Sequence, residues 1–591
     1  MLILPLNESY LHFKHPQETY HVRGWDPLLR LLTQLTTRSQ NPAWLGGWIS
    51  YPHARRGPEA YLEVHHHDPQ PHPGPNSMGQ DSKLWLSPLI PKWNQCAYQT
   101  AFERVQEVLR MGESYQINLT FPLVTTLLLR PWLSKHSQPS QWDWEGLLEE
   151  LWRAVGSQSK RVQGSLIVPP RQVQNRCPRA LLSWSPEAWI RARPLGVSRW
   201  EFESRPMKGT ALRSANLAED LENGLRLHRS PKTRAENLMI TDMVRHEFSQ
   251  LVQPGRVEVL RLFEVEPLNT LWQMTSTVWA MGIFNAHPLP EIIAKLFPPA
   301  SITGAPKRRT MEWIQRIEKW ERGIYTGVTF LVTPWGEMES SVAIRSLQVN
   351  LKTAQALFGV GGGVLIDSTV QEEYHEALSK AFFLKSRVAD FDLLETLRWE
   401  PQGGFRNLEH HLRRLARSAA ALRRPWRRYE VVRELKKAVA GGSRGLRVRL
   451  TLSPGGEVRV EAEPLVEFDL PLLLTPAKKP IQGSELLRRF KTSRREVYEK
   501  FKPAPGQETL LWDEEGYVLE GTFTNLAFFI EGTWLTPSLT RPLLGGVMRE
   551  ILLQQGRLKE ANIKLEDALS APKAACFNSL RGWMDAAWSP T

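Results

Sequence analysis

The chain has 591 residues, of which 41% are hydrophobic and 23% are charged, and this composition is typical of a globular protein with several domains. Its formal charge is +13, but the basic residues are scattered and no nucleic-acid motif accompanies them, so we exclude a nucleic-acid partner. No run approaches the roughly 18 apolar residues of a membrane span, so we also expect no membrane contact.

At the N-terminus, the segment MLILPLNESY lacks the basic start of a secretory signal. The three cysteines show no paired metal spacing, and a reducing cytoplasm is the expected location. The segment Leu45–Tyr51 (LGGWISY) predicts a short strand. The histidine-rich segment Val64–Asn76 permits either a metal site or a loop, and its prolines and irregular ligand spacing favour a flexible loop.

A helix followed by a strand is predicted after Tyr98. Apolar residues recur at helical spacing from Phe102 to Leu109, and Gly112 stops the helix. The next residues, 115–120, alternate as a strand. The tryptophan-rich segment Trp132–Trp152 opens with loop-forming residues, and we expect an insertion that packs its own small apolar cluster.

Seven motifs then follow one another: SWSPEAW (183–189), RPMKGT (205–210), SPKTRAENLMITDMVRHEF (230–248), ASITGAPK (300–307), SVAIRSL (341–347), GVGGGVLIDS (359–368) and EEYHE (372–376). In this order they resemble the chorismate-utilising family, which includes anthranilate, aminodeoxychorismate, isochorismate and salicylate synthases. The resemblance implies an α+β protein whose N-terminal domain, residues 1–388, is an α/β sandwich of antiparallel sheets and helices.

Lys208 in RPMKGT distinguishes members of this family, because Pro-x-Lys-Gly-Thr resembles the aminodeoxychorismate synthases, whereas anthranilate synthases carry alanine at the lysine position. The resemblance implies that Lys208 is a nucleophile and that Glu187 is the general acid at the C4 hydroxyl of chorismate. Ammonia would then add at carbon 4. An anthranilate-type product is the alternative for this domain, and Lys208 argues against it.

Two glutamates in EEYHE, Glu373 and Glu376, lie three residues apart and share a face if the segment is helical. With Glu236, which occupies the family's third acidic position, they would form a hard oxygen site suited to Mg²⁺. A solvated acidic helix face is the other interpretation. Lys380, one turn further on, matches a family lysine near the substrate carboxylate.

The same resemblance extends to other residues around the substrate. Tyr325 and Arg345 match residues that hold the pyruvyl carboxylate, and an arginine suits that role because its planar fork bonds both oxygens. The remaining expected substrate-binding residues are Thr303, Gly304, Gly361 and Gly362. Three positions depart from the common family pattern and are expected to reshape the rim of the pocket: Gln273, Pro299–Ala300 and Phe330.

The source of ammonia is not expected within this chain. A glutaminase needs a nucleophilic cysteine on a tight glycine-flanked turn, and Cys96, Cys177 and Cys576 all lack that setting. A separate glutamine amidotransferase subunit is therefore implied.

A composition change after residues 380–390 marks a second domain, which we place at 391–591. It resembles the class IV pyridoxal-phosphate (PLP) enzymes, a smaller α+β unit found in aminodeoxychorismate lyase and in branched-chain and D-amino-acid aminotransferases. The resemblance implies PLP, with Lys491 as the Schiff-base lysine and Glu520 beneath the pyridine nitrogen. It also implies phosphate contacts from Arg414, Gly546 and Val547.

The reaction of the second domain has two interpretations. The segment Asn578–Trp583 (NSLRGW) resembles lyase-like members, and a lyase would consume the product of the first domain. The pair would then make 4-aminobenzoate, a folate precursor, and release pyruvate. A branched-chain or D-amino-acid aminotransferase is the alternative. Class IV enzymes are usually dimers, so a homodimer through this domain is expected.

Overall fold

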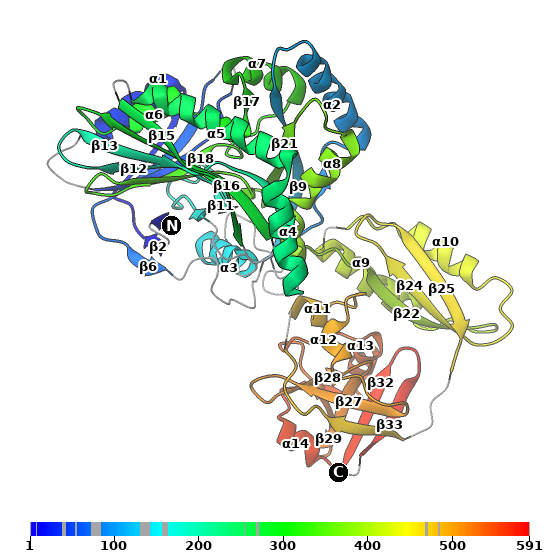
Figure 1. Ribbon diagram of the computed structural model, residues 1–591. Helices are drawn as coiled ribbons and strands as arrows, with labels where there is room; N and C mark the ends of the chain where they lie inside the picture. The colour runs from blue at the N-terminus through cyan, green and yellow to red at the C-terminus, as the bar shows by residue number, and fades with distance from the viewer. Residues whose placement is uncertain are drawn as a thin grey trace. The chain divides into compact units, whose positions relative to one another are not determined.

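A computed structural model describes residues 2–6, 9–37, 43–53, 56–72, 84–129, 142–156, 163–214, 216–252, 255–267, 271–422, 424–466, 471–482 and 485–589. The chain forms two compact units, the first ending at Val388 and the second beginning at Ala389. Figure 1 shows helices and sheets in both units.

The first sheet of unit 1 is antiparallel throughout its described strands. Its long strand β9 pairs with β21 so that Gly361 lies opposite Thr120 and Gly363 lies opposite Asn118. The strands run in the order β17 (Gly304–Ala305), β9 (Gln116–Leu129), β21 (Gln355–Val364), β20 (Ser346–Asn350), β11 (Arg179–Ser185), β10 (Gln163–Ile167), β1 (Leu2–Leu6), β2 (Ser9–Phe13) and β6 (Gln70–His72), and β7 (Leu84–Leu86) and β8 (Ile90–Pro91) also pair with β9.

The second sheet of unit 1 is also antiparallel. A Cβ on Gly46 in β4 would come within 2.8 Å of Leu4 Cδ1 in the first sheet, because the two sheets approach closely there. The strands run in the order β14 (Met207–Leu212), β16 (Leu271–Ile283), β13 (Arg199–Ser204), β12 (Ala188–Pro194), β19 (Met338–Val342), β18 (Val328–Val332), β4 (Trp44–Ile49), β5 (Glu59–His65) and β3 (Glu18–Arg23), and β15 (Gly255–Pro267) pairs with β16.

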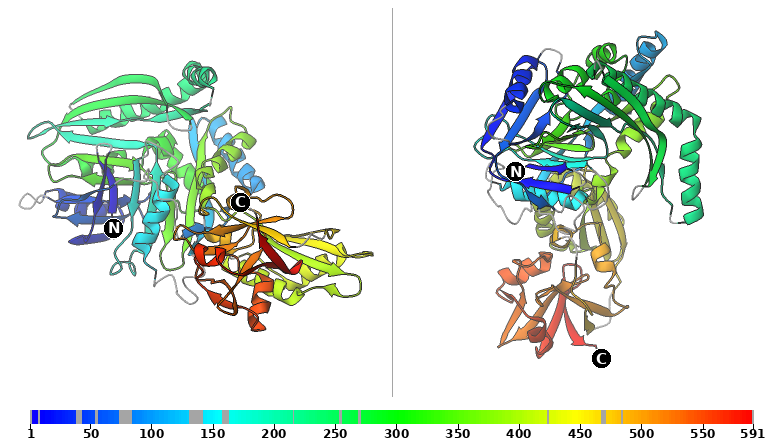
Figure 2. Two further views of the ribbon diagram at one scale, coloured as in Figure 1. Left: turned by 90° about the horizontal axis from the view of Figure 1, so that it is seen from below. Right: turned by 60° about the vertical axis from the view of Figure 1, so that its left-hand side comes forward.

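Helices cover the outer faces of the two sheets (Figure 1, Figure 2). One core joins the first sheet to α2, α3, α7 and α8, a second joins the other sheet to α1, α5 and α6, and a third lies between the sheets. This arrangement confirms the expected sandwich. The helices are α1 (Trp25–Thr36), α2 (Gln95–Arg110), α3 (Trp144–Gly156), α4 (Leu217–Arg229), α5 (Pro231–Leu251), α6 (Leu289–Leu296), α7 (Lys307–Glu318) and α8 (Val370–Ser379), with 3-10 turns η2 (Ala300–Ile302) and η3 (Phe382–Arg387).

Unit 2 contains a small antiparallel sheet and a larger mixed sheet. In the larger sheet β26 pairs in parallel with both β27 and β33. The small sheet runs β23 (Gly404–Phe405), β22 (Leu393–Glu400), β24 (Leu446–Leu452), β25 (Val458–Pro464), and the larger runs β28 (Val518–Gly521), β27 (Gln507–Trp512), β26 (Leu472–Pro476), β33 (Gly582–Trp588), β32 (Lys573–Asn578), β29 (Asn525–Ile530), β30 (Thr533–Pro537), β31 (Lys559–Ala561).

The helices of unit 2 complete the expected α+β organisation. Two of them, α9 and α10, pack against the small sheet, on β22 and β25 respectively. Helix α13 begins after a glycine, Gly546, and packs on β32 of the larger sheet. The bounds are α9 (Leu408–Ala421), α10 (Arg428–Ala438), α11 (Glu485–Arg489), α12 (Glu496–Glu499), α13 (Val547–Gln554) and α14 (Leu565–Leu569).

Several local predictions are confirmed. Strand β4 begins at Trp44 and ends at Ile49, within one to two residues of the predicted strand. Helix α2 begins where the Asn94 side chain accepts a hydrogen bond from the Ala97 N–H, and Gly112 follows its end with φ 71°. Strand β9 then starts at Gln116 and continues well beyond the predicted residue 120.

Two local predictions are wrong. The described part of 132–152 is not a separate cluster, because Trp144 and Trp152 of α3 belong to the main core of the first sheet. The Trp152 indole donates to Ser183 O at 2.9 Å, and the Trp184 indole donates back to Trp152 O at 2.9 Å. The histidine-rich segment includes the end of β5 and all of β6, so it is not entirely loop.

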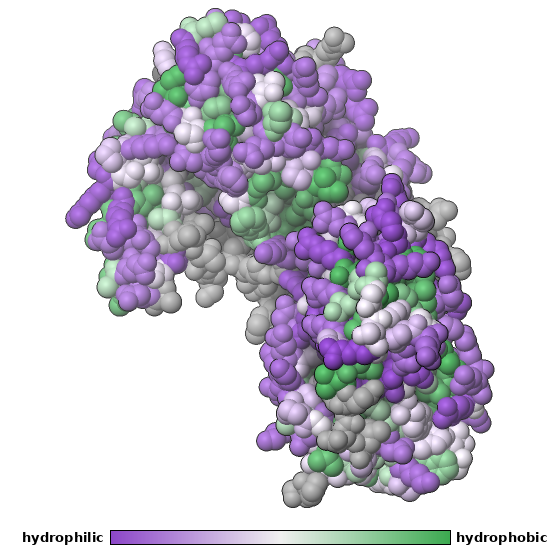
Figure 3. Space-filling model, turned by 90° about the vertical axis from the view of Figure 1, so that its right-hand side faces the viewer, coloured by the Kyte–Doolittle hydropathy of each residue, from purple (hydrophilic) through white to green (hydrophobic). Residues whose placement is uncertain are grey.

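Hydrophilic residues cover most of the face seen in Figure 3. No helix among the described residues is long and apolar enough to cross a membrane.

Two candidate active sites

Lys208 lies on a distorted stretch of β14. The register between β14 and β16 shifts between Met207 and Thr210, and such a bulge changes the direction of the side chains within it. Gly209 has φ 93°, and a Cβ there would come within 2.0 Å of Thr233 Cγ2 on α5. The Gln273 side chain donates to Gly209 O at 2.9 Å. The glycine after the lysine is therefore required by backbone conformation and by packing.

The Lys208 ammonium faces residues from three other elements. Its Nζ lies 4.0 Å from Glu236 Oε2 on α5 and 3.1 Å from the position that a Cβ of Gly363 would take. Its positive charge also lowers the pKa values of Glu187 and Glu373 relative to those that burial alone would give. The structure thus places Lys208 beside one predicted metal ligand, Glu236, and its charge also acts on the predicted general acid and on Glu373.

Glu187 is buried between β11 and β12, where it lines a small cavity of about 10 Å³ together with Ser301 and Pro206. Burial raises the pKa of Glu187 to about 7, against the opposing effects of a hydrogen bond from Ser301 and the charge of Lys208. A carboxyl group with this pKa is half protonated at neutral pH and can serve as a proton donor.

Glu373, Glu376 and Lys380 extend from α8 toward the glycine run of β21. Burial raises the pKa of Glu373, and the charge of Lys380 lowers the pKa of Glu376. Lys380 Nζ lies 3.0 Å from Glu376 Oε1 and donates to Gly361 O at 2.7 Å. A Cβ on Gly362 would lie 3.0 Å from Glu373 Oε2, so the glycine leaves room for the carboxylate.

The three predicted metal ligands do not form a ready metal site. Among the described residues, no group of three or more His, Cys, Asp or Glu side chains is arranged to hold a metal ion. Two cations lie among the carboxylates instead, because Lys208 approaches Glu236 and Lys380 pairs with Glu376.

Arg345 is a partly buried cation with no anion beside it among the described residues. Its guanidinium makes no hydrogen bond or ion pair with the residues that the structure describes, and burial lowers its pKa. Tyr325 packs its ring onto Gly359, where a Cβ would come within 2.2 Å of the ring. No described hydrogen bond or ion pair joins either residue to the group around Lys208.

The predicted loop residues Thr303 and Gly304 are fixed by the backbone around them. The Thr303 hydroxyl donates to Pro299 O at 3.3 Å and to Ala300 O at 3.1 Å. Gly304 has φ 150°, and a Cβ there would come within 1.9 Å of Gln116 O. The loop therefore lies directly against the start of β9.

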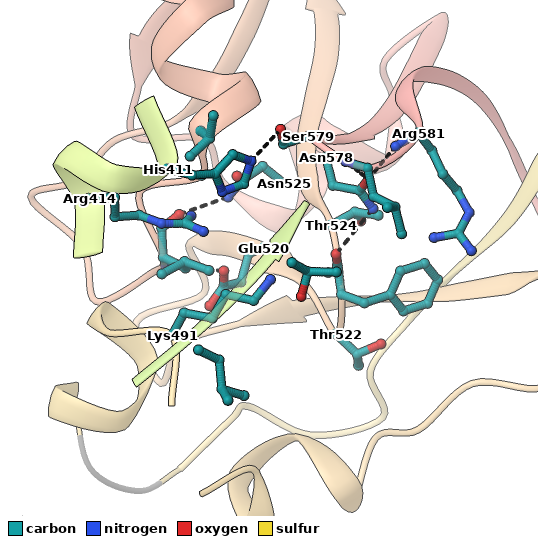
Figure 4. A pocket seen from close by; sticks show the side chains of 18 of the residues that line it. His411, Arg414, Lys491, Glu520, Thr522, Thr524, Asn525, Asn578, Ser579 and Arg581 are labelled. Atoms are coloured by element: carbon teal, nitrogen blue, oxygen red, sulfur yellow. Dashed lines mark hydrogen bonds between the residues drawn. The ribbon is translucent and has the colours of Figure 1, made fainter. Parts of the chain in front are cut away.

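The second candidate site is a cavity of about 420 Å³ in unit 2 (Figure 4). The structure places all five residues predicted for the cofactor around it. They come from separate segments: Arg414 from α9, Lys491 after α11, Glu520 from β28, and Gly546 and Val547 at the start of α13.

Lys491 is held by its backbone, which accepts a hydrogen bond from the Leu394 N–H at 2.8 Å. Burial lowers the pKa of Lys491 to about 7, and the positive charge of Arg414 acts in the same direction. About half of the Lys491 amine groups are then neutral at neutral pH, and a neutral amine is the form that acts as a nucleophile or base.

Glu520 points into the same cavity. It accepts hydrogen bonds from the Tyr498 hydroxyl at 2.8 Å and from the Leu544 N–H at 3.1 Å. Burial raises the pKa of Glu520 to about 7, which these hydrogen bonds oppose. A cationic ring nitrogen placed beside this carboxyl would favour its charged form.

The sequence analysis missed three residues at this site: His411 and Ser579, which line the cavity, and Glu395, which holds Arg414. Glu395 binds Arg414 through two hydrogen bonds, at 2.9 and 2.6 Å, and also bonds His411 Nδ1 at 2.6 Å. His411 Nε2 lies 2.7 Å from the Ser579 hydroxyl (Figure 4). His411 and Arg414 are three residues apart on a helix, and that spacing was an available signal. Glu395 lies on β22, and no local pattern marks it, whereas Ser579 follows β32 and lies within the NSLRGW segment that resembles lyase-like members.

A further pair, Arg447 and Arg449, also lines this cavity. They alternate along β24, and residues two apart on a strand project from the same face. Arg447 lies 3.3 Å from Glu463 on the neighbouring strand. For Arg449 no hydrogen bond or ion pair with another described residue is present.

Residues 168–386 match the chorismate binding enzyme family, and residues 392–587 match the class IV amino-transferase family. The chain joins a chorismate binding enzyme domain to a class IV aminotransferase domain. The boundary between the two matches falls where the structure divides into two units.

Relatives of the chorismate binding domain include aminodeoxychorismate synthase component 1 of Salmonella typhimurium, which is 32% identical over 48% of this chain and 56% of that protein. The chain thus spans about half the length of the curated relatives that it matches first. A solved structure from Bacillus anthracis, assigned as a 2,3-dihydroxybenzoate-specific isochorismate synthase, aligns with TM-score 0.50 and 18% identity over 65% of this chain and 95% of that one, and it shows a shared fold.

For the class IV domain, a Mesorhizobium loti structure assigned as an amino-acid aminotransferase is 36% identical over 34% of this chain and 100% of that one, with TM-score 0.32.

Proposed function

We propose that this protein converts chorismate and ammonia to 4-amino-4-deoxychorismate in its first domain and eliminates pyruvate from that compound in its second. The product is 4-aminobenzoate, a folate precursor. The observation that carries the proposal for the first step is the position of Lys208, whose Nζ lies 4.0 Å from Glu236 and whose charge acts on the buried carboxyl group of Glu187.

In the first domain, Lys208 Nζ attacks carbon 2 of the ring, the ring double bond shifts, and the hydroxyl leaves carbon 4 as water after accepting the proton of Glu187. Ammonia then adds at carbon 4, the double bond shifts back, and the Lys208 amine is expelled from carbon 2. One water is released for each ammonia consumed, so the reaction balances without an oxidant or a reductant.

The carboxylates of chorismate need cations to hold them. Arg345 supports this role, because a partly buried guanidinium without a partner among the described residues can bind an anionic ligand. Lys380 is the second cation on our proposal, and Thr303, Gly304, Tyr325, Gly361 and Gly362 shape the rest of the pocket.

We also propose Mg²⁺ as a cofactor, bound by Glu236, Glu373 and Glu376. Three carboxylates are suitable hard oxygen ligands. Burial, together with the neighbouring charge of Glu376, raises the pKa of Glu373 because it disfavours the charged carboxylate. A divalent cation bound there would stabilise the charged form. Binding would require Lys208 to release Glu236, and the neutral Lys208 amine is also the form needed for attack.

Two protein partners belong to the proposal. The name of the Salmonella relative, component 1, supports a separate second component, and we infer a glutamine amidotransferase that supplies ammonia. The class of the second domain supports a homodimer formed through it.

The second domain fits PLP. Class IV enzymes use this cofactor, and the cavity provides a lysine, a carboxyl group and a phosphate cradle on separate walls. At the cradle, a Cβ on Gly546 would come within 1.9 Å of Asn525 Oδ1, so only glycine keeps the start of α13 open. Arg414, Gly546 and Val547 would hold the phosphate, and Glu520 would face the ring nitrogen. Bound PLP supplies the electron sink for carbanion chemistry.

Within this cavity, Lys491 takes the proton from carbon 4 of aminodeoxychorismate. The ether oxygen leaves carbon 3 with its bonding electrons as enolpyruvate, and the ring becomes aromatic. Arg447 and Arg449 support a lyase, because the substrate carries two carboxylates and two guanidiniums on one strand face can bind both.

The test is to incubate the purified protein with chorismate, PLP, Mg²⁺ and ammonium and to identify the products. We expect 4-aminobenzoate and an equal amount of pyruvate. Lys208→Ala should abolish amination at carbon 4, whereas Lys352→Ala, an exposed lysine of the same unit, should not. Formation of anthranilate, or transamination of amino acids without pyruvate release, would replace the proposal with one of its alternatives.

A further inference from the structure

Gln116, the first residue of β9, is only 2% exposed. Its side-chain oxygen accepts no hydrogen bond from any residue that the structure describes. A buried polar group without a partner costs free energy, and most such groups in proteins are paired. One explanation for a buried polar group without a protein partner is that it forms its hydrogen bond with a ligand or a reacting group.

The backbone around Gln116 is fixed. Its carbonyl oxygen accepts a hydrogen bond from the Ser114 hydroxyl at 2.9 Å and lies against Gly304. Gln116 also pairs with Ala305 of β17. The residue therefore links the start of β9 to the loop that carries Thr303 and Gly304, and the direction of its side chain is set by this scaffold.

The Gln116 side chain extends to the same place as the Lys208 amine. A Cβ on Gly363 would lie 2.1 Å from Gln116 Nε2 and 3.1 Å from Lys208 Nζ. The carboxamide and the amine thus flank one point on β21. Any residue other than glycine at 363 would push them apart.

The chemistry of an amide suits this place. A half-turn of the carboxamide exchanges Oε1 and Nε2 and keeps the space that the side chain fills. The oxygen then faces Lys208 and can accept a hydrogen bond from one N–H group of its amine. That bond fixes the rotation of the amine and therefore the direction of its lone pair. An amide carries no charge at neutral pH, so it orients the amine without holding it as an ammonium ion.

We propose that Gln116 is a positioning residue of the first site, whose side-chain oxygen accepts an N–H from the Lys208 amine as that amine attacks the ring. The proposal rests on the proposed function, because it assigns Gln116 to the nucleophile of that reaction. Its contribution is to orientation, and poor orientation of a nucleophile lowers kcat more than substrate affinity.

Two substitutions test this role. Gln116→Leu keeps the bulk and removes the acceptor, and we expect kcat for amination to fall about 10- to 100-fold while KM for chorismate changes by no more than about threefold. Gln116→Glu keeps an acceptor oxygen at the same reach, and its kcat should lie between those of the wild type and Gln116→Leu.

The matched control is Gln106→Leu. Gln106 is also buried with an unpartnered side-chain oxygen, but its amide donates to Leu365 O at 2.8 Å, which is a structural role. Gln106→Leu should lower the unfolding temperature, and it should not reproduce the selective fall in kcat expected for Gln116→Leu. A Gln116→Leu variant with the kcat of the wild type would overturn the proposal.

A second readout does not require turnover. The rate of Lys208 acetylation by acetic anhydride at one fixed pH, followed by peptide mass mapping, reports how the amine is held without any turnover. We expect this rate to change in Gln116→Leu and to stay at the wild-type value in Gln106→Leu. Equal rates in the wild type and Gln116→Leu would defeat this inference, whereas failure of the wild type to aminate chorismate would defeat the proposed function.

Discussion

The pKa values of buried glutamates in this protein shift in opposite directions according to their neighbours. Burial raises the pKa of Glu187 to about 7, because only one hydroxyl and one lysine oppose it. Burial also disfavours the charged form of Glu395, but Arg414 and His411 outweigh it and lower the pKa to about 2. Residue type alone does not decide the role: one carboxyl group is suited to donate a proton and the other to orient cations.

The amination rate should therefore fall as pH rises. Glu187 acts in its protonated form, and with a raised pKa of about 7 that form is lost above neutral pH. Rates measured between about pH 6 and pH 9 and divided by the concentration of free ammonia should decline through about pH 7. Glu187→Gln should lower the rate by about 100-fold or more and remove this decline. A Glu187→Gln variant whose pH profile above neutral pH has the same shape as that of the wild type would contradict the role of Glu187.

At the level of single residues, the sequence predicts the reactive groups better than their supports. Lys208 and Lys491 stand in recognisable motifs, but Ser301 is far from Glu187 along the chain, and Ser579 is far from His411. Such contacts depend on the packing of distant segments, which no local pattern encodes. Gln116 lies within the predicted strand 115–120, and nothing in the sequence marks it as a site residue. Its burial and its side-chain oxygen without a described hydrogen bond are visible only in the structure.

At the scale of elements, one carboxylate organises the loop beneath the second cavity. Glu508 on β27 is fully buried. Its Oε1 accepts the N–H groups of Thr509 and Thr522, at 2.9 and 2.8 Å, and its Oε2 accepts the Phe523 N–H at 3.2 Å. The hydroxyls of Thr522 and Thr524 add two more hydrogen bonds at 2.7 Å. The loop held in this way lines the cavity directly after Glu520.

Glu508→Gln should loosen this loop although the two side chains have nearly the same shape. A backbone N–H faces each oxygen of Glu508, so the amide nitrogen of glutamine meets a donor in either orientation. Each unsatisfied donor costs about 1–3 kcal/mol. We expect a lower unfolding temperature and PLP binding weakened about tenfold in fluorescence titrations. Glu566→Gln, an exposed glutamate of α14, is the control, and equal PLP affinity in both variants would contradict this role for Glu508.

Elements were predictable where the pattern was local. The helix and strand around Gly112 were correctly predicted, because a helical apolar period, a glycine that ends it and an alternating stretch all lie within one short segment. Residues 132–152 were wrongly predicted to pack alone. The partners of Trp144 and Trp152 are Leu351, directly after β20, and Ser183, on β11, and both come later in the chain, so periodicity could not reveal them.

At the scale of the whole molecule, two units carry two sites with different chemistry. The carboxylates of the first site lie on α5 and α8, and all cavity residues of the second follow Val388. We therefore expect the sites to respond independently to loss of metal. Chelation with EDTA, or Glu373→Gln, should abolish amination of chorismate and leave elimination of pyruvate from added aminodeoxychorismate within about twofold of the untreated protein.

The control for this separation is Glu103→Gln, an exposed glutamate on α2, which should affect neither reaction. If a folded Glu373→Gln variant no longer converts added aminodeoxychorismate, the two sites are coupled and the division proposed here is wrong.

Replacement of Lys491 should have the complementary effect. Lys491→Ala removes the amine whose low pKa suits it to take the proton at carbon 4, so elimination of pyruvate should fall by at least about 1,000-fold. The first site is unchanged, and chorismate with ammonia should then accumulate as aminodeoxychorismate, which chromatography detects directly. The visible absorbance of the bound cofactor should also change, whereas Lys500→Ala, at an exposed position of the same unit, should keep both absorbance and turnover. Continued release of 4-aminobenzoate by Lys491→Ala would show that another residue of the cavity takes the proton.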